Sequence, residues 1–201
     1  MNKRKNFTLS LATALVFSVL LSISGFDAKC HEIEKEVLRL HIIANSDSSE
    51  DQALKLKVRD RVLQLESDLC QNAESKAQAM EIVNEHIEEI ESVAKRVVAD
   101  NGYDYSVKAT LTNCYFPTRD YESFTLPAGN YDALRITICE AKGKNWWCVL
   151  FPEICLGTAA DFSGVLSNES ENIVSNPSHF KVKFKVVELY RGIKEKISAI
   201  F

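Results

Sequence analysis

Residues 38–60 constrain the fold most, because their pattern changes type within a few positions. The run LRLHII at 38–43 is short, apolar and partly β-branched, which is typical of a buried strand. The next residues, ANSDSS, favour turns and helix caps, and Glu50 follows Asp47 at the spacing of a capping box. The stretch therefore predicts a strand, a turn capped by Asp47, and a helix to about Cys70. The apolar stripe of that helix is Leu54, Val58, Val62, Leu65 and Leu69.

Three polar side chains, His41, Asn45 and Asp47, gather where this strand and helix are expected to meet. A histidine, an aspartate and a nearby serine are the parts of a hydrolytic triad. The same residue types also satisfy the free backbone N–H groups of a first helical turn. The stretch lacks the Gly-x-Ser-x-Gly form that exposes a serine nucleophile, so capping is the stronger interpretation. His41 alternates with Leu40 and Ile42 and is expected to point away from the core.

The N-terminal segment has the pattern of a targeting sequence. A basic start, MNKRK, precedes residues 7–23, which are apolar and uncharged. This run is long for a signal peptide and near the lower limit for a membrane span. We expect residues 1–28 to be a signal peptide or an N-terminal membrane segment, with export and cleavage favoured over retention as an anchor. Residues 29–201 are expected to form a single domain, which contacts a membrane only through the N-terminal segment.

Beyond the first helix, the periodicity changes from helical to alternating. A second amphipathic helix is expected over residues 75–99, with glutamates around its apolar face. Alternating patterns then predict strands near residues 107–112, 134–139 and 146–151. A glycine-containing loop separates the last two strands, which are therefore expected to form a hairpin.

The C-terminal quarter of the chain has a mixed pattern. Residues 157–180 are rich in Ser, Asn and Glu and are expected to form a long loop. Residues 182–186 alternate apolar residues with lysines, which predicts a last strand, and a short helix is expected near Tyr190. The chain is therefore assigned to the α+β class, with two amphipathic helices packed on a mainly antiparallel sheet.

The charge balance argues against nucleic acid as a partner. The chain has 24 basic and 28 acidic residues, and Lys3, Arg4 and Lys5 of the basic ones lie in the targeting segment. Nucleic acid is bound mainly by neutralising phosphates with Lys and Arg, which an acidic chain does poorly. No metal or cofactor is expected either, because the sequence has no Cys-x-x-Cys, no His-Glu-x-x-His and no glycine-rich phosphate loop.

The six cysteines allow two roles, a disulfide or a thiol nucleophile. Disulfides form in oxidising compartments, and Cys148 and Cys155 are the best pair, seven residues apart across a proline-containing turn. Cys148 is also a candidate nucleophile with His41, because such partners meet only in space. A secreted hydrolase that uses His41 or Cys148 is therefore the alternative to a binding protein.

Two groups of residues are candidates for contact with a partner protein. Trp146 and Trp147 are neighbours on an expected strand, so one indole can enter the core while the other is exposed, although packing of the pair in the core and at its edge is the commoner arrangement. An exposed tryptophan is a frequent anchor of a protein interface. The first helix carries two short basic stripes, which are either a solvated face or a contact for an acidic partner. These stripes consist of Lys55, Lys57, Arg59 and Arg61.

Two segments of the sequence resemble one protein family. They are HIIANSD at 41–47, with SSEDQALKLKVRD after it, and LPAGNYDALRITICEAKGKNWWCVLFPEIC at 126–155. Both are similar to segments of the stage II sporulation protein R family, whose members are secreted signalling proteins of endospore-forming bacteria. The chain departs from the family at Glu153 and Ile154, where Pro and Leu are usual.

The resemblance implies a function that the residue patterns alone do not reach. It implies a protein that is made in the forespore and exported into the space between forespore and mother cell. There it would activate a membrane-embedded aspartic protease, stage II sporulation protein GA, which matures pro-sigma-E. On this view the chain is a ligand that shifts a protease between states and is not an enzyme. Its contact residues would come from the two groups above or from His41, Asn45 and Asp47.

Overall fold

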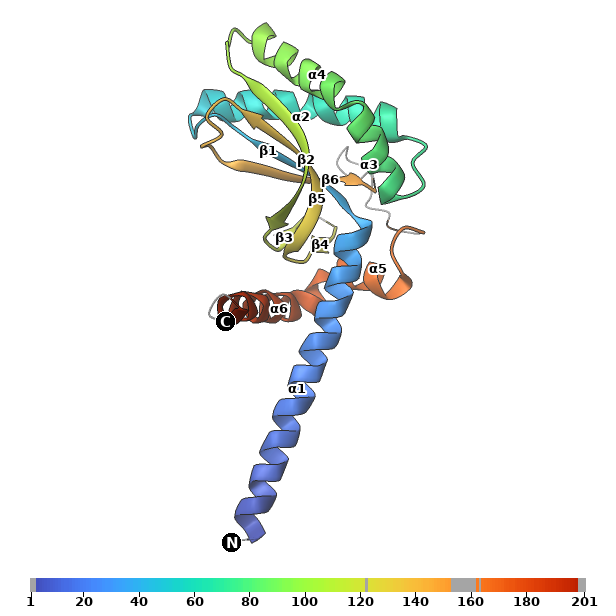
Figure 1. The fold of residues 1–201 in the computed structure, drawn as a ribbon, viewed down its shortest axis with the longest axis vertical. Coiled ribbons are helices and arrows are strands. Elements are labelled where there is room, and N and C mark those ends of the chain that lie inside the picture. The colour runs from blue at the N-terminus through green and yellow to red at the C-terminus, as the bar shows by residue number, and fades with distance from the viewer. Residues whose placement is uncertain (1–2, 122, 153–161, 163, 199–201) are drawn as a thin grey trace.

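A computed structural model of the chain describes residues 3–121, 123–152, 162 and 164–198. Within these residues, helices pack on both faces of a four-stranded mixed sheet, which confirms the α+β class (Figure 1). In sheet order, the strands are β2 (Val107–Phe116), β5 (Gly129–Ile138), β1 (Leu38–Ile43) and β6 (Asn145–Phe151). A separate two-stranded sheet consists of β3 (Arg119–Asp120) and β4 (Thr125–Leu126).

Strand β1 lies inside the sheet, between β5 and β6. It pairs in parallel with β5 and antiparallel with β6, and all six of its residues are buried. The predicted hairpin of β5 and β6 is therefore wrong, because β1 separates the two strands. Their connecting loop crosses the end of β1, where the backbone N–H groups of Lys142 and Gly143 donate to the carbonyl oxygens of Asn45 and Ala44 at 3.0 and 2.9 Å.

Helices α2 (Ser49–Cys70), α3 (Lys76–Glu85) and α4 (Ile87–Asp100) cover one face of the sheet. The sequence predicts α2 correctly but expects one helix where α3 and α4 lie. The break is at His86, whose backbone angles (φ −103°, ψ 15°) leave the α-helical region. The ring Nδ1 of His86 lies 2.9 Å from the carbonyl oxygen of Ile82. The core on this face includes Leu40, Ile42, Val58, Val83, Ile90, Ala94, Leu134 and Ile136.

The opposite face of the sheet is covered over only part of its length. A second buried cluster there joins Phe116, Tyr131 and Val149 of the sheet to two C-terminal helices, α5 (Asn168–Ser175) and α6 (Pro177–Ser198). The rest of this face carries half-exposed polar side chains. This uncovered part leaves room for a binding surface.

The C-terminal segment differs from its sequence prediction. The sequence predicts a loop over residues 157–180 and a strand over 182–186, whereas α5 and α6 occupy residues 168–175 and 177–198. Part of the expected loop, residues 157–161 and 163, lies outside the described residues. The alternation VKFKV is too short to distinguish a strand from a helix. Over a longer window, the residues that face the domain recur at helical spacing; they are Phe180, Phe184 and Val187.

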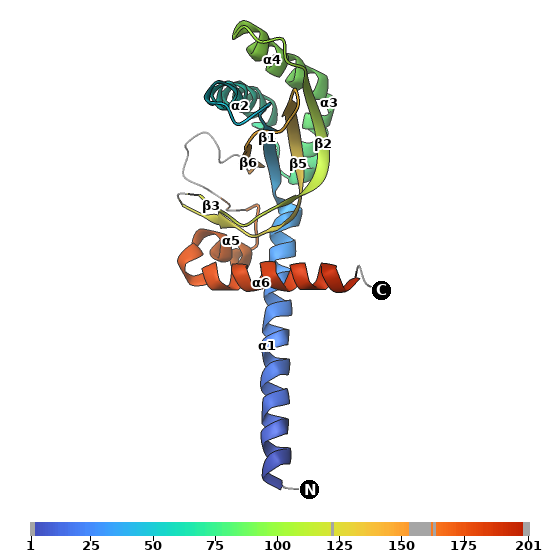
Figure 2. The same cartoon turned by 90° about the vertical axis from the view of Figure 1, so that its left-hand side faces the viewer.

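Helix α1 (Lys3–Glu36) runs without a break from the apolar N-terminal segment into the domain (Figures 1 and 2). It is long and apolar enough to cross a membrane, which fits a signal peptide or an anchor. Its large apolar side chains from Phe7 to Leu21 are exposed, whereas Cys30, Ile33 and Glu34 are buried. The helix therefore passes residue 28, the expected end of the targeting segment, and the position of a cleavage stays a prediction.

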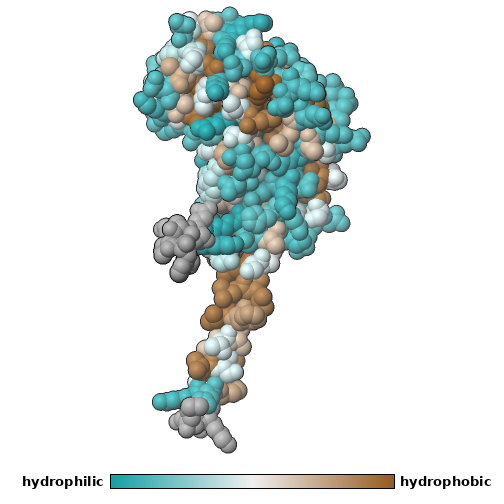
Figure 3. Space-filling view, viewed as in Figure 1, coloured by the Kyte–Doolittle hydropathy of each residue, from teal (hydrophilic) through white to brown (hydrophobic). Residues whose placement is uncertain are grey.

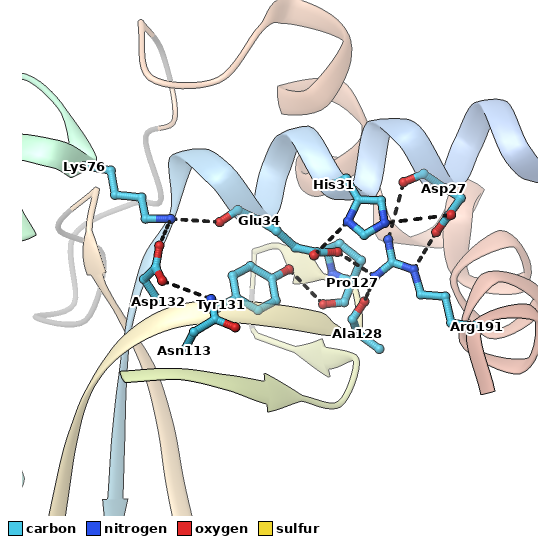
Figure 4. Close-up of polar contacts among 10 residues, drawn as sticks. All are labelled: Asp27, His31, Glu34, Lys76, Asn113, Pro127, Ala128, Tyr131, Asp132 and Arg191. Atoms are coloured by element: carbon cyan, nitrogen blue, oxygen red, sulfur yellow. Dashed lines mark hydrogen bonds and ion pairs between the residues drawn. The ribbon is translucent and has the colours of Figure 1, made fainter. Parts of the chain in front are cut away.

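An ion-pair network joins the two ends of the chain (Figure 4). Arg191 of α6 donates from Nε to Asp27 Oδ1 and from Nη1 to Glu34 Oε1, each at 2.5 Å. Its Nη1 also donates to the carbonyl oxygen of Ala128 at 2.7 Å, just before β5. Gly129 is required at the next position, because a Cβ there would overlap the carboxylate of Glu34. The network thus holds α1, α6 and the start of β5 together.

Replacing Arg191 with leucine should destabilise the domain. The change leaves two largely buried carboxylates without their cation, and loss of one partner of a buried ion pair costs about 3 to 5 kcal/mol. Urea unfolding of the full chain in detergent, followed by tryptophan fluorescence, measures the effect. Arg61→Leu, at an exposed position of α2, is the matched control and should change the free energy of unfolding by less than about 0.5 kcal/mol. Equal midpoints for the two variants would contradict the importance of the network.

Candidate functional site

Hydrogen bonds within the chain hold the junction between β1 and α2, where the sequence places a polar cluster. Ser48 is the helix cap, because its hydroxyl oxygen accepts from the backbone N–H of Asp51 at 3.2 Å. The prediction that Asp47 is the cap is therefore wrong by one residue. Asp47 Oδ1 instead accepts from the backbone N–H of Lys144 at 2.7 Å, so Asp47 holds the β5–β6 loop against the start of α2.

Asn45 and Asp51 form the centre of this junction. The Asn45 side chain donates to Asp51 Oδ2 at 2.8 Å and accepts from the backbone N–H of Glu140 at 3.2 Å. Ser46 Oγ donates to the same carboxylate oxygen at 2.5 Å. That bond from Ser46 is the main cause of a lowered pKa of Asp51, and burial opposes it. These side chains bond to one another and to the β5–β6 loop, so the structure gives the cluster an architectural role.

Ser48→Ala should lower the free energy of unfolding by about 1 kcal/mol, the usual cost of removing an N-terminal cap. Ser49→Ala is the matched control, because the Ser49 hydroxyl is exposed and donates only as far as the neighbouring Glu50. Urea unfolding of the two variants side by side measures the difference. If Ser49→Ala is the more destabilising change, the cap is misplaced.

The four basic residues of α2 do not form one exposed patch. Lys55 is 4% exposed, and its Nζ donates to a carbonyl oxygen of the β5–β6 loop at 2.9 Å. Burial lowers the pKa of Lys55. The guanidinium of Arg59 lies over Trp146, 4.4 Å from the ring centroid. Of the two expected stripes, that of Lys57 and Arg61 is exposed and that of Lys55 and Arg59 is not, and a contact with an acidic partner stays a prediction.

Trp146 and Trp147 lie on opposite faces of β6, which is an edge strand. Trp146 packs against the helix-covered core, and Trp147 packs against the second cluster. Both indoles are partly buried, which agrees with packing of the pair in the core and at its edge and not with one fully exposed ring.

On the less covered face of the sheet, Trp147 is the centre of a group of rings and a cation. The His41 ring stacks on Trp147 with centroids 3.9 Å apart, and the guanidinium carbon of Arg119 lies 5.7 Å from the Trp147 centroid. Phe116 meets both rings edge-on, with centroids 4.6 Å from Trp147 and 5.9 Å from His41. These four residues are referred to below as the stacked face. His41 lies on the opposite face of the sheet from the core residues Leu40 and Ile42, as their alternation predicts, but it is only 6% exposed because Trp147 covers it there.

Arg39 is fully buried beneath the stacked face. Its guanidinium carbon lies 4.1 Å from the ring centroid of Phe116 and 4.9 Å from that of Tyr131. Its Nη2 donates to Tyr121 Oη at 2.5 Å and its Nε to the carbonyl oxygen of Cys148 at 3.4 Å, while Nη1 has no partner. No ion pair joins Arg39 to a carboxylate among the described residues. A buried cation held by rings and not by a carboxylate gives this part of the protein a positive local field.

His41 is not arranged as a catalytic base. Its Nε2 lies 2.8 Å from Asn145 Oδ1, which can only accept, so Nε2 carries the proton. Burial lowers the pKa of His41, and the charges of Arg135 and Arg39 lower it further. The ring is therefore neutral at pH 7. Its Nδ1 is buried without a partner, so no hydroxyl, thiol or carboxylate of the described residues completes a triad.

Among the described cysteines, neither Cys148 nor Cys30 offers an activated thiol. Cys148 is disulfide-bonded and so holds no free thiolate. Cys155 lies outside the described residues, so the pairing of Cys148 with Cys155 stays a prediction. Burial raises the pKa of the free Cys30 thiol to about 12. In the part of the chain that the structure describes, no group of three or more His, Cys, Asp or Glu side chains could hold a metal ion.

Arg39 and Arg119 are parts of the site that the sequence does not select. Arg39 is the one charged residue in the apolar run LRLHII, and a charge in such a run is a signal of a buried cation with ring or carbonyl partners. Arg119 lies in a segment with turn signals, and no pattern relates it to Trp147. That relation depends on how β3 folds back beside the sheet.

The lowered pKa of His41 predicts a dependence of stability on pH. Above about pH 6.5, the usual histidine pKa, the ring is neutral in both states and its contribution is constant. As the pH falls below that value, the unfolded chain binds the proton more readily than the folded one, so the domain loses stability. The urea midpoint should fall between about pH 7.5 and 5.5, and less so for His41→Gln, whose amide can still donate to Asn145. The other histidines are present in both proteins and contribute equally to the pH dependence. If the urea midpoint of His41→Gln falls as steeply with pH as that of the wild-type chain, the lowered pKa of His41 is contradicted.

Comparison with known proteins identifies the family. A family model described as stage II sporulation protein R matches residues 34–161. The chain belongs to the stage II sporulation protein R family. It is also similar to stage II sporulation protein R of Bacillus subtilis (strain 168), with 37% identity over 131 residues, which are 65% of this chain and 57% of that protein. The match thus spans little more than half of that relative's length, and no solved structure matches the chain.

The family match fits the site in one respect. The matched residues include β1 to β6, and so they contain the whole stacked face, whereas α5 and α6 lie beyond them. The family is one of sporulation signalling proteins.

Proposed function

We propose that the protein is exported from the forespore into the space between forespore and mother cell, where it activates a membrane-embedded aspartic protease. The protease of this proposal is stage II sporulation protein GA, and its product is mature sigma-E. The family match over residues 34–161 carries the proposal. An N-terminal helix that fits a signal peptide or an anchor is consistent with export. Activation is then a binding event, in which the chain has a higher affinity for the active state of the protease than for the inactive one.

We place the contact with the protease on the stacked face. Tryptophan and arginine are the residues that most often dominate interface energies, and Trp147 and Arg119 lie together at its rim. The positive field of Arg39 favours an acidic group on the partner. Beside the stacked face, the sheet register places Arg135 opposite His41 and Thr110 opposite Arg135, and both are half-exposed. This strip would extend the contact along the open sheet.

A secreted hydrolase is the alternative class, and no specific observation favours it. His41 is neutral and bonded to Asn145, and Cys148 holds no free thiolate. An activator that works by binding needs neither group as a reagent. We therefore also propose that the protein is not an enzyme.

The test is binding and processing by variants of the stacked face. Trp147→Ala and Arg119→Ala should each weaken binding to the extracytoplasmic part of the protease by about 2 kcal/mol, or roughly 30-fold. Binding is measured by titration with the full chain in detergent. Processing of pro-sigma-E is measured by immunoblot in sporulating cells whose own copy is deleted, and circular dichroism confirms that each variant is folded.

Arg61→Ala is the matched control, because Arg61 is an exposed basic residue on the helix-covered side of the sheet. It should bind and signal like the wild-type chain. If it is defective while both stacked-face variants are normal, the contact lies on α2. If the wild-type chain does not bind the protease at all, the proposed function fails.

A further inference from the structure

Helix α6 has an apolar stripe on the face that points away from the domain. Its inner face carries Phe180, Phe184 and Val187, which pack in the second cluster. On the opposite face, apolar side chains recur every three or four residues and are exposed, from 38% at Val186 to 76% at Val182. The stripe consists of Val182, Val186, Leu189 and Ile193. A contiguous apolar stripe on a helix surface marks a contact with another apolar phase.

Lysines lie on both sides of this stripe. At 100° per residue, Lys185 lies on one side of it and Lys183 and Lys194 lie on the other, and all three are exposed. Residues 177–198 contain six basic and two acidic residues, although the whole chain is acidic. An apolar stripe with lysines along its edges is the pattern of a helix that lies in a membrane interface. The lysine stems cover apolar surface while the ammonium groups reach the lipid headgroups.

The position of α6 matches this pattern. It lies crosswise to α1, at the level where the apolar N-terminal part of α1 ends and the domain begins (Figures 1 and 2). A groove between the two helices is lined by Ile23 and Phe26 of α1 and by Val182 and Val186 of α6. The exposed apolar surface of α1, brown in Figure 3, therefore continues onto the stripe. A bilayer around the N-terminal part of α1 would have its surface at α6.

We propose that α6 is a membrane-surface helix, which lays the domain on an anionic bilayer beside α1. The proposal rests on the proposed export, because export brings both helices to a membrane. It goes beyond the expectation that only the N-terminal segment touches lipid. A second copy of the chain is a poorer occupant, because two stripes packed together would bring the lysines of both helices close to one another.

This placement bears on the stacked face. The ammonium group of Lys181 on α6 lies 3.9 Å from a carboxylate oxygen of Asp120, which is the neighbour of Arg119. Glu188 of α6 accepts from the hydroxyl of Thr118 at 3.3 Å. The segment that contains Arg119 is therefore in contact with α6 through Thr118 and Asp120. A domain that lies on α6 presents the stacked face close to the bilayer, within reach of a membrane-embedded partner.

The test uses the full chain reconstituted into vesicles of phosphatidylcholine and phosphatidylglycerol. Leu189→Trp places a reporter in the stripe, at a side chain that is 66% exposed and so tolerates the change. Lipids brominated near the upper part of the acyl chain should quench this reporter, whereas the wild-type chain, with only Trp146 and Trp147, measures the background. Ala77→Trp, at an exposed position of α3 far from α6, is the matched control and should not be quenched. Circular dichroism confirms that the variants are folded.

Two outcomes would overturn the proposal. If aqueous acrylamide quenches Leu189→Trp as strongly as Ala77→Trp, the stripe faces water. If the reporter is protected from acrylamide but the brominated lipids do not quench it, a second copy or another protein segment covers the stripe.

The charge of the lipids provides a second, independent test. Lipid quenching of Leu189→Trp should weaken at least threefold in vesicles of phosphatidylcholine alone, and changing Lys183, Lys185 and Lys194 to glutamine should abolish that difference. Equal quenching in both vesicles would overturn the anionic specificity. The protease takes no part in any of these measurements, so a chain that fails to bind the protease can still pass them.

Discussion

The contact of Arg191 with the carboxylates of Asp27 and Glu34 is the interaction on which the packing of the domain depends. It joins residues 164 and 157 positions apart in the sequence, and so makes one body of the first and last helices. Its third acceptor is the carbonyl of Ala128, and a glycine begins β5 at the next position because a side chain there would take the place of the Glu34 carboxylate. On the far side of the same helical turn, the Lys76 ammonium group donates to the Glu34 carbonyl and pairs with Asp132 at 2.7 Å. The end of α1 is thus fixed both to the helices on the other face and to the sheet.

Local patterns predict those parts of the fold whose partners are local. β1 and α2 are found because an apolar run, a turn and a helical stripe each complete their pattern within a few residues. The pairing of β5 with β6 is mistaken because a hairpin is the default for neighbouring strands, and only tertiary structure reveals that β1 enters between them. The VKFKV alternation fails for the opposite reason. Five residues satisfy a strand pattern, while Phe180 and Val187, outside that window, decide that the segment is a helix with one buried face.

For the candidate site, too, the sequence predicts what depends on nearby residues and misses what depends on distant ones. The sequence selects His41, Trp146 and Trp147 because histidine and tryptophan are conspicuous residue types. It does not show which way each side chain points, because β6 is an edge strand with partial cover on both faces. The cap moves from Asp47 to Ser48 since both residue types serve equally well, and the choice depends on the backbone N–H of Lys144, far along the chain. The sequence does not select Arg39 as a site residue, because its contacts with Phe116 of β2 and Tyr131 of β5 exist only in the folded sheet.

The central position of β1 has a consequence for the order in which the domain can fold. A chain that crosses a membrane from its N-terminus delivers β1 first, and the carbonyl to which Arg39 donates arrives 109 residues later. Both strand partners of β1, β5 and β6, also lie far along the chain, and contacts so distant in sequence form slowly. Arg191 arrives later still. For a chain that is exported as proposed, the contacts of β1 with β5 and β6 and those of Arg191 with α1 therefore form only after most of the domain has crossed the membrane.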